Sequence, residues 1–355
     1  MKVTVERDGI TDEISRIMDY EFNGTSEFVP HQFTPLDYET TLKDFGIGLI
    51  VGPSGSGKTT LLAEFGSEVE PEWNPDKAIA SHFEDIDDVQ NKLGAVGFNS
   101  VPSWMRPYHV LSNGEQFRAR LARQLDSNIV VDEFTSVIDR DVAKSCSHAI
   151  CRYVKKNGLK NIVFSSCHYD IIEWLQPDWV FDTQTGKLTT RGYQRPEIVL
   201  EILPATSESW KDFSPHHYLD GNVNKGAACW VTIWNGRLVG FLSSIAMPSG
   251  ALKNAWRGHR TVVLPEFQGL GIGARMTEAL GEIHLSEGKR FFTKTAHPRL
   301  GEYRNSSPRW RGTTYNGLSR PDMGKEYTHN KKYSKELMAK HANRVCYAHE
   351  YVGVT

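Results

Sequence analysis

The chain has 355 residues, of which 24% are charged and 39% hydrophobic, and its formal net charge is -2. This length favours two domains, each able to bury its own core. No run of residues is long and apolar enough for a transmembrane helix, and the charged N-terminus lacks the apolar core of a secretory signal, so we expect neither a membrane-spanning nor a secreted protein.

Five scattered cysteines lack the paired spacing of a metal site or disulfide framework: Cys146, Cys151, Cys167, Cys229 and Cys346. An odd number of unpaired thiols is typical of a reducing compartment, so we expect a cytoplasmic protein.

Between Phe45 and Asp182, short apolar strands alternate with amphipathic helices. This pattern predicts an α/β domain with a largely parallel sheet. The predicted strands are Gly46–Val51, Asn128–Val131 and Asn161–Ser165, because each is short, apolar and β-branched, as strands buried on both faces are.

The chain turns polar around Thr185–Pro196, and we place the domain boundary there, between residues 1–195 and 196–355. Gly226–Met247 then predicts a β-hairpin that turns at Asn235-Gly236, because Asn-Gly between apolar runs favours tight hairpin turns. The sequence further predicts an α+β second half with a strand at Arg260–Leu264 and helices at Ile272–Ser286 and near Ser334–Asn343.

A phosphate-binding loop follows the first predicted strand. The residues from Gly52 to Thr59 match G-x-x-x-x-G-K-[ST] in full, and a helix is expected to follow. Lys58 is expected to reach the β- and γ-phosphates and Thr59 to bind Mg²⁺, whereas the alternative is a glycine-rich loop that binds no nucleotide. The residues predicted to contact the nucleotide are Gly52, Ser54, Gly55, Ser56, Gly57, Lys58, Thr59 and Thr60.

Two carboxylates, Asp132 and Glu133, come directly after the predicted strand that ends at Val131. Asp132 is placed to hold Mg²⁺, and Glu133 is placed to polarise the attacking water, a division of roles that phosphoryl transfer needs. In isolation, the same pair could simply cap a strand.

Further motifs make the resemblance specific. Leu111-Ser-Asn-Gly-Glu-Gln116 resembles the LSGGQ signature of ABC-type ATPases, Ser136–Asp139 resembles their D-loop, and His168 resembles their switch histidine. The motifs stand in the family's order over roughly residues 45–185. The resemblance implies that Glu133 is catalytic, that His168 contacts the γ-phosphate, and that Ser112 and Gly114 bind ATP held by another subunit. It therefore implies an ATP-promoted homodimer with two composite sites.

The chain departs from this family at several positions. Phe134 stands where proline is usual, and Asn99 or Ser100 stands where a glutamine is expected, with Gln90 as the other candidate. The aromatic residue that stacks on adenine could be Phe33 or Tyr38.

A second anion-binding turn lies between the predicted strand at Arg260–Leu264 and the helix from Ile272. Its sequence resembles motif A of GNAT acetyltransferases, Q/R-x-x-G-x-G/A, and the upstream hairpin resembles that family's second and third strands. Backbone N–H groups at such a helix start can bind the pyrophosphate of acetyl-CoA or another acyl-CoA. The implied contacts are Leu264, Gln268, Gly269, Leu270, Gly271, Ile272, Gly273 and Ala274, and the alternative is a structural turn.

The candidate acyltransfer residues are Tyr303, Tyr315 and His297, which lie downstream of this turn. The resembled family often uses a carboxylate or water as base and a tyrosine or cysteine as acid. Each candidate also has a structural interpretation, since the tyrosines could belong to the core and His297 could end a strand.

The C-terminal segment is basic. From Lys289 to Arg344, about fourteen Lys or Arg residues stand against about four Asp or Glu, with aromatic residues between them. Basic and aromatic side chains together favour nucleic acid as a partner. The alternatives are a solvated basic face, an acidic protein partner, or attraction of the CoA phosphates.

These motifs predict an ABC-type P-loop ATPase that uses ATP and Mg²⁺, followed by a GNAT-like acyltransferase that acts on nucleic acid. Two alternatives stay open. The acceptor could be a protein or small amine with ATP as regulator, or the chain could be a non-catalytic clamp switched by ATP.

Overall fold

The computed structural model describes residues 2–27, 42, 44–190, 192–217, 222–248, 250, 252–318 and 345–353. The chain forms two compact units. The first comprises residues 1–71, 124–136 and 151–194, and the second comprises residues 72–123, 137–150 and 195–355. None of the helices in the described ranges is long and apolar enough to cross a membrane.

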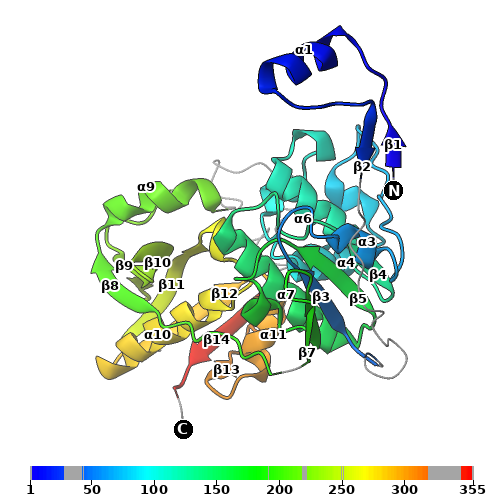
Figure 1. Cartoon of the computed structure of the whole chain (residues 1–355). Coiled ribbons are helices and arrows are strands. Elements are labelled where there is room, and N and C mark those ends of the chain that lie inside the picture. The colour runs from blue at the N-terminus through cyan, green and yellow to red at the C-terminus, as the bar shows by residue number, and fades with distance from the viewer. Residues whose placement is uncertain are drawn as a thin grey trace. The chain divides into compact units, whose positions relative to one another are not determined.

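A five-stranded sheet in the order β4-β5-β3-β6-β7 organises the first unit (Figure 1). Its neighbours pair in parallel except for β6 and β7, which confirms the predicted largely parallel sheet. The three predicted strands form within a residue of their expected ends. The strands are β3 (Ile47–Val51), β4 (Ile129–Val131), β5 (Ile162–Ser166), β6 (Trp179–Asp182) and β7 (Lys187–Thr190).

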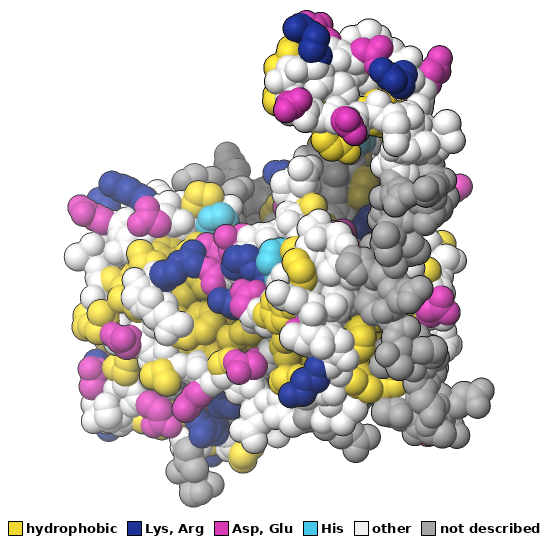
Figure 2. All heavy atoms as spheres, in the orientation of Figure 1, with side chains coloured by type: hydrophobic (Ala, Val, Ile, Leu, Met, Phe, Trp, Pro, Cys, Tyr) yellow, Lys and Arg dark blue, Asp and Glu magenta, His cyan; other side chains and the backbone are white. Residues whose placement is uncertain are grey.

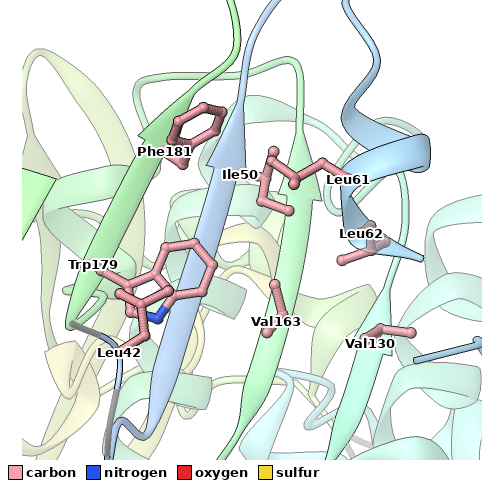
Figure 3. Close-up of a cluster of buried hydrophobic side chains, with 8 residues drawn as sticks. All are labelled: Leu42, Ile50, Leu61, Leu62, Val130, Val163, Trp179 and Phe181. Carbon is pink, nitrogen blue, oxygen red and sulfur yellow. The ribbon is translucent and has the colours of Figure 1, made fainter. Parts of the chain in front are cut away.

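Apolar side chains from these strands and from α3 (Lys58–Leu62) form one core (Figure 3). Trp179 is 1% exposed, and the ring of Phe65 stacks on it with centroids 5.5 Å apart. A Cβ at Gly48 would overlap the Trp179 ring, so glycine at that position of β3 allows the ring to lie against the sheet. The core therefore anchors the strand that leads into the phosphate loop.

The first unit also contains β1 (Lys2–Thr4), α1 (Gly9–Met18), β2 (Thr25–Glu27) and α8 (Ile172–Leu175). Helix α1 has no buried residue, although apolar side chains recur along it. Figure 2 shows apolar side chains among charged ones on this segment, and Ile10, Ile17 and Met18 are each more than 60% exposed.

The second unit contains α4 (Ile86–Ala95), α5 (Val101–Trp104), α6 (Asn113–Gln124) and the first part of α7 (Arg140–Asn157). Helix α6 starts with a reciprocal cap. The Ser112 hydroxyl accepts from the N–H of Glu115, and the Glu115 carboxylate accepts from the N–H of Ser112. The signature motif therefore begins a helix, as its sequence predicted.

The second unit also holds a seven-stranded sheet in the order β13-β14-β12-β11-β10-β9-β8. Its neighbours are antiparallel except for β11 and β12. The strands are β8 (Glu201–Ala205), β9 (Ala228–Trp234), β10 (Arg237–Ala246), β11 (Ala255–Val263), β12 (Arg290–Thr295), β13 (Trp310–Gly312) and β14 (Tyr347–Tyr351). The helices of this part are α9 (Trp210–Phe213), α10 (Ile272–Ser286) and α11 (Pro298–Ser306).

The predicted hairpin is confirmed as β9 and β10. Asn235 and Gly236 both have positive φ, 50° and 74°, and Trp234 pairs with Arg237 across the turn. This is the two-residue turn whose twist matches the strands. Helix α10 has the predicted bounds, whereas β11 starts five residues earlier than predicted, because Ala255–His259 lacks a clean apolar alternation.

Several elements of the second unit were not predicted: β8, α9, α11, β13 and β14. They are short, and β13 pairs with a strand that is distant in sequence. Phe33, Tyr38 and the predicted helix near Ser334–Asn343 lie outside the described residues.

Candidate active sites

The phosphate loop is curled around the Lys58 side chain. The Lys58 ammonium donates to the carbonyl oxygen of Pro53 at 2.9 Å, and the residue is only 5% exposed. Gly55 and Gly57 have φ of 76° and 86°, which residues with a Cβ rarely adopt. A buried ammonium inside a curl of backbone is suited to phosphate oxygens, so these residues fit the triphosphate of ATP.

Thr59 and Asp132 come together at the carboxyl ends of β3 and β4. The Thr59 hydroxyl donates to Asp132 Oδ2 at 2.7 Å, and the Ser165 hydroxyl of β5 donates to Asp132 Oδ1. Burial opposes the charge on Asp132, but the hydrogen bonds from Ser165 and Thr59 outweigh it and lower the pKa of the carboxyl group. A hydroxyl and an ionised carboxylate side by side form an oxygen pair that fits Mg²⁺.

Glu133 has a fixed position next to this pair. Its φ is 50°, and the Ser136 hydroxyl donates to Glu133 Oε2 at 2.5 Å. Phe134 donates its N–H to the Ser165 carbonyl at 2.7 Å, and its ring packs on Phe164 with centroids 4.4 Å apart. A proline could not donate this bond, which gives the departure from the usual proline a physical reason.

His168 follows β5 and reaches the same end of the sheet. Its Nδ1 lies 3.5 Å from the Thr135 hydroxyl, and its N–H donates to the Ser166 hydroxyl at 3.1 Å. Ser166 in turn donates to the carbonyl of Phe134 at 2.8 Å. The strand ends therefore hold the carboxylate segment and His168 in one hydrogen-bonded group.

The signature residues Ser112 and Gly114 belong to the second compact unit, whereas the phosphate loop belongs to the first. Gly114 accepts a hydrogen bond at its carbonyl from Arg118, and a Cβ at Gly114 would lie 3.1 Å from Ile138. The start of α6 is thus closely packed against the segment that follows Ser136.

The second anion-binding turn runs from Leu264 into α10. Gly271, with φ of 81°, is the N-cap of the helix, has no side-chain cap and has nothing within 4 Å of its Cβ position. The first N–H groups of a helix lack intrahelical acceptors, here those of Ile272, Gly273 and Ala274. Gln268 is tied inward because its side-chain amide donates to the Val263 carbonyl at 2.9 Å.

Strands β11 and β12 diverge beside this turn. They pair only where Ala255, Trp256 and Arg257 face Arg290, Phe291 and Phe292, although β11 continues to Val263 and β12 to Thr295. Backbone groups on the diverging part are available to an extended ligand that adds between them. The open turn and the divergent strands together fit the pyrophosphate and the extended arm of acyl-CoA.

Residues 195–302 match the acetyltransferase (GNAT) family. They form a GNAT-family acetyltransferase domain. The family match thus confirms the GNAT resemblance found in the sequence. The first unit has a largely parallel sheet with the phosphate loop, Asp132-Glu133 and His168 at its strand ends, as the resemblance to ABC-type ATPases implies.

Solved structures of both kinds are similar to parts of the chain. A dimeric ATP-binding cassette, MJ0796, bound to ADP and phosphate is 14% identical, with a TM-score of 0.33, over 43% of this chain and 87% of its own. An acetyltransferase from Bacillus subtilis in complex with CoA is 11% identical, with a TM-score of 0.30, over 45% of this chain and 100% of its own.

An IAA acetyltransferase from Bacillus cereus is 13% identical, with a TM-score of 0.29, over 43% of this chain and 99% of its own. A comparison with curated proteins found no match.

In the GNAT domain, the Tyr303 hydroxyl is engaged by a carboxylate that the sequence did not single out. It donates to Glu278 Oε1 at 2.6 Å, and Arg275 donates to Glu278 Oε2 at 2.8 Å. Glu278 is 2% exposed. Burial and this carboxylate raise the pKa of Tyr303, which makes it a weaker acid. In the sequence, Glu278 could have been noticed because it stands three residues after Arg275 on a predicted helix, a spacing that allows an ion pair.

The other two candidates occupy different places. His297 is the N-cap of α11, where its N–H donates to the Thr295 hydroxyl at 3.0 Å, and Tyr315 follows β13 with 70% of its surface exposed. His259, at an irregularity of β11, also borders the divergence, but its Nε2 accepts from the N–H of Asn224 at 3.1 Å. That bond occupies the lone pair that a base would need.

Three arginines in the described part of the C-terminal segment have partners within the protein. Arg290 and Arg311 both pair with Glu350, at 2.6 Å and 2.7 Å. Arg304 is 2% exposed, and its guanidinium lies 4.7 Å from the centroid of the buried Trp310 ring. The sequence could not distinguish these structural arginines from ones that face a ligand.

Proposed function

We propose that the chain hydrolyses MgATP and transfers an acyl group from acyl-CoA to an amine of a nucleic acid. The observation that carries the acyltransfer is the open turn at Gly271 beside two divergent strands, within the region that matches the acetyltransferase family. The ATPase proposal is carried by the adjacent Thr59, Asp132 and Glu133.

In the ATPase site, Lys58 and the loop backbone would hold the phosphates. Thr59 and Asp132 would hold Mg²⁺, which supplies charge neutralisation on the transferring phosphoryl group. Glu133, oriented by Ser136, would accept the proton of the attacking water, and His168 would contact the γ-phosphate.

The ATP site is proposed to be completed by a second copy of the chain. One chain carries one phosphate loop and one signature, and its Ser112-Gly114 helix start offers N–H groups that favour a phosphate. Two copies arranged head to tail would bury two ATP molecules. Such an arrangement makes dimerisation dependent on ATP.

In the acyltransferase site, bound acyl-CoA supplies a thioester. The acceptor nitrogen would bond to the acyl carbon as the carbon–sulfur bond breaks, and the proton lost by nitrogen would finish on the sulfur. The turn from Gly269 to Ala274 would hold the pyrophosphate, and the edge of β11 that diverges from β12 would align the arm. Holding the acyl group against the amine is a large part of such catalysis.

A nucleic acid is proposed as the acyl acceptor because part of the chain is rich in positive charge. Residues 319–344 contain seven Lys or Arg against three Asp or Glu, together with Tyr327 and Tyr333. Arg304 is buried, whereas Arg290 and Arg311 are partly exposed, so a polyanion would be met by residues 319–344 together with these two arginines. Phosphate contacts of this kind are independent of sequence.

The test is transfer of radiolabelled acetyl from acetyl-CoA, with MgATP, to total DNA, RNA and protein in parallel. Label in DNA or RNA supports the proposal and names the polymer. Label only in protein replaces the nucleic acid by a protein acceptor. No label, together with no binding of CoA, leaves an ATP-switched clamp and refutes the acyltransferase.

A further inference from the structure

The turn that would hold the CoA pyrophosphate is packed against segments that belong to the ATPase sequence. Gly97 and residues 145–149 lie against the turn. They and the neighbouring segments 91–96, 114–118 and 141–144 share the second compact unit with the GNAT domain. Contacts within one compact unit offer a physical route between the two chemistries. These contacts are made by the backbone of the turn at Gln268 and Gly269.

Two glycines meet at the centre of this contact. A Cβ on Gly269 would lie 3.5 Å from the Cα of Gly97 and 3.5 Å from the Ala149 side chain on α7. A Cβ on Gly97 would lie 3.5 Å from the carbonyl oxygen of Gln268. Both glycines have positive φ, 96° and 70°. The backbone of the CoA turn therefore lies in direct contact with the backbone at Gly97.

Arg118 of α6 joins Gly97 to the signature. Its Nη1 donates to the Gly97 carbonyl at 3.2 Å, its Nε donates to the Gly114 carbonyl at 3.2 Å, and its guanidinium lies 4.9 Å from the Phe98 ring centroid. The residue is 8% exposed. A buried guanidinium held by two carbonyls is costly to displace, so Gly114 and Gly97 are expected to move together.

Two more contacts tie the GNAT domain to the same segments. Arg237 of β10 pairs with Asp141 at the start of α7, and its guanidinium lies 5.3 Å from the ring centroid of Phe267, beside the turn. Arg299 of α11 donates to the carbonyl of Asn91 at 2.9 Å. Its guanidinium lies where a Cβ on Gly94 would be, so the glycine makes room for it.

We infer that acyl-CoA binding at the Gly269–Gly271 turn is coupled to ATP engagement at Ser112–Gly114 through Arg118 and Gly97. This inference rests on the proposed function, because it needs both ligands and the ATP-dependent dimer. A phosphate bound at the start of α6 fixes Gly114, and Arg118 passes that constraint to Gly97 and the turn. The turn is then pre-organised for the pyrophosphate, which raises acyl-CoA affinity.

Coupling between binding sites is reciprocal, so it can be measured from either side. CoA affinity of the full-length Glu133→Gln protein is measured by calorimetry with and without saturating MgATP. We expect MgATP to tighten CoA binding by about 5-fold or more, and CoA to tighten ATP binding by the same factor. An unchanged or weaker CoA affinity overturns the coupling.

Arg118→Met in the Glu133→Gln background keeps the aliphatic stem but removes the link. It is expected to bind both ligands with no mutual effect. Arg123→Met is the matched control, because Arg123 lies on the same helix, donates to the Glu72 carbonyl at 2.5 Å and lies 4.8 Å from the Trp73 ring centroid. The control is expected to keep the full effect, and equal loss in both variants overturns the role of Arg118.

If Arg118→Met does not fold, Arg118→Lys tests the same contact, because lysine keeps the charge but lacks the planar fork that reaches both carbonyls. A reduced coupling factor is expected, and an unchanged factor counts against the route. Failure of the proposed function is distinguishable from failure of the coupling. A chain that binds no CoA under any condition refutes the acyltransferase, whereas tight, independent binding of both ligands refutes only the coupling.

Discussion

Thr59 and Asp132 are joined by a hydrogen bond of 2.7 Å between the threonine hydroxyl and Asp132 Oδ2. Ser165 holds the other oxygen of the same carboxylate from the neighbouring strand. The Mg²⁺ pair proposed for this chain is therefore oriented before any metal arrives, and the serine provides a way to disturb the pair without removing either member.

Ser165→Ala is predicted to weaken Mg²⁺ binding in the ATPase reaction by about 10- to 100-fold, because partners that orient a metal ligand contribute on this scale. The measurement is the ATPase rate against Mg²⁺ concentration. Ser286→Ala, an exposed serine on α10 whose hydroxyl donates to the Ile283 carbonyl, is the control. An unchanged Mg²⁺ requirement in Ser165→Ala would contradict the assignment of Asp132.

Glu133→Gln is predicted to slow ATP hydrolysis at least about 100-fold, as loss of a general base does, while ATP binding is kept. Trapped ATP should then hold two copies together, and sedimentation should show a dimer with MgATP and a monomer without it. Adding Lys58→Ala to the same protein should restore the monomer. A chain that stays monomeric with bound ATP would refute the composite site.

Tyr303→Phe separates a structural tyrosine from a catalytic one. Because Tyr303 donates to the buried Glu278, its loss should lower the free energy of unfolding by about 1–3 kcal/mol and leave kcat within a few-fold. Tyr315→Phe, at an exposed position, should change neither quantity. A large fall in kcat at an unchanged Tm would instead identify Tyr303 as the proton donor.

His284 predicts acid sensitivity of the GNAT domain. Burial and the nearby Lys289 lower its pKa from 6.5 to about 4, and its ring stacks between Trp256 and Phe291. Because the unfolded chain takes up this proton first, stability should be fully present above about pH 6.5 and should fall as the pH drops toward 4.

His284→Phe removes the titrating group and leaves the Ser244 hydroxyl without its imidazole partner. We expect a lower Tm at pH 7.5 but a smaller difference in Tm between pH 7.5 and pH 5. The wild-type difference persisting in full would show that other groups control the acid response.

The parts of the fold and site that could be predicted from the sequence are those that depend on short local motifs. The Asn235-Gly236 turn, the phosphate loop around Lys58 and the helix start at Gly271 each depend on residues that are adjacent in the chain. Backbone conformations with positive φ leave a record in the sequence because few residue types adopt them.

Contacts between residues that are far apart in the sequence could not be predicted in this way. Glu278 meets Tyr303 from 25 positions away, and Gly97 meets Gly269 although nearly half of the chain separates them. Arg118 is indistinguishable in sequence from the exposed arginines of a polar helix, although it is buried between two carbonyls. Only the packing identifies these residues.

The measurement that tests the two-site account most directly is binding of MgATP and of CoA to three variants of the full-length chain. Lys58→Ala should lose ATP and keep CoA, and Gly271→Glu should lose CoA and keep ATP. Gly288→Glu is the matched control, since Gly288 follows the opposite end of α10 with φ of 70° and open space around it. It should bind both ligands as the wild type does. Unchanged CoA affinity in Gly271→Glu, or ATP retained by Lys58→Ala, would contradict the account.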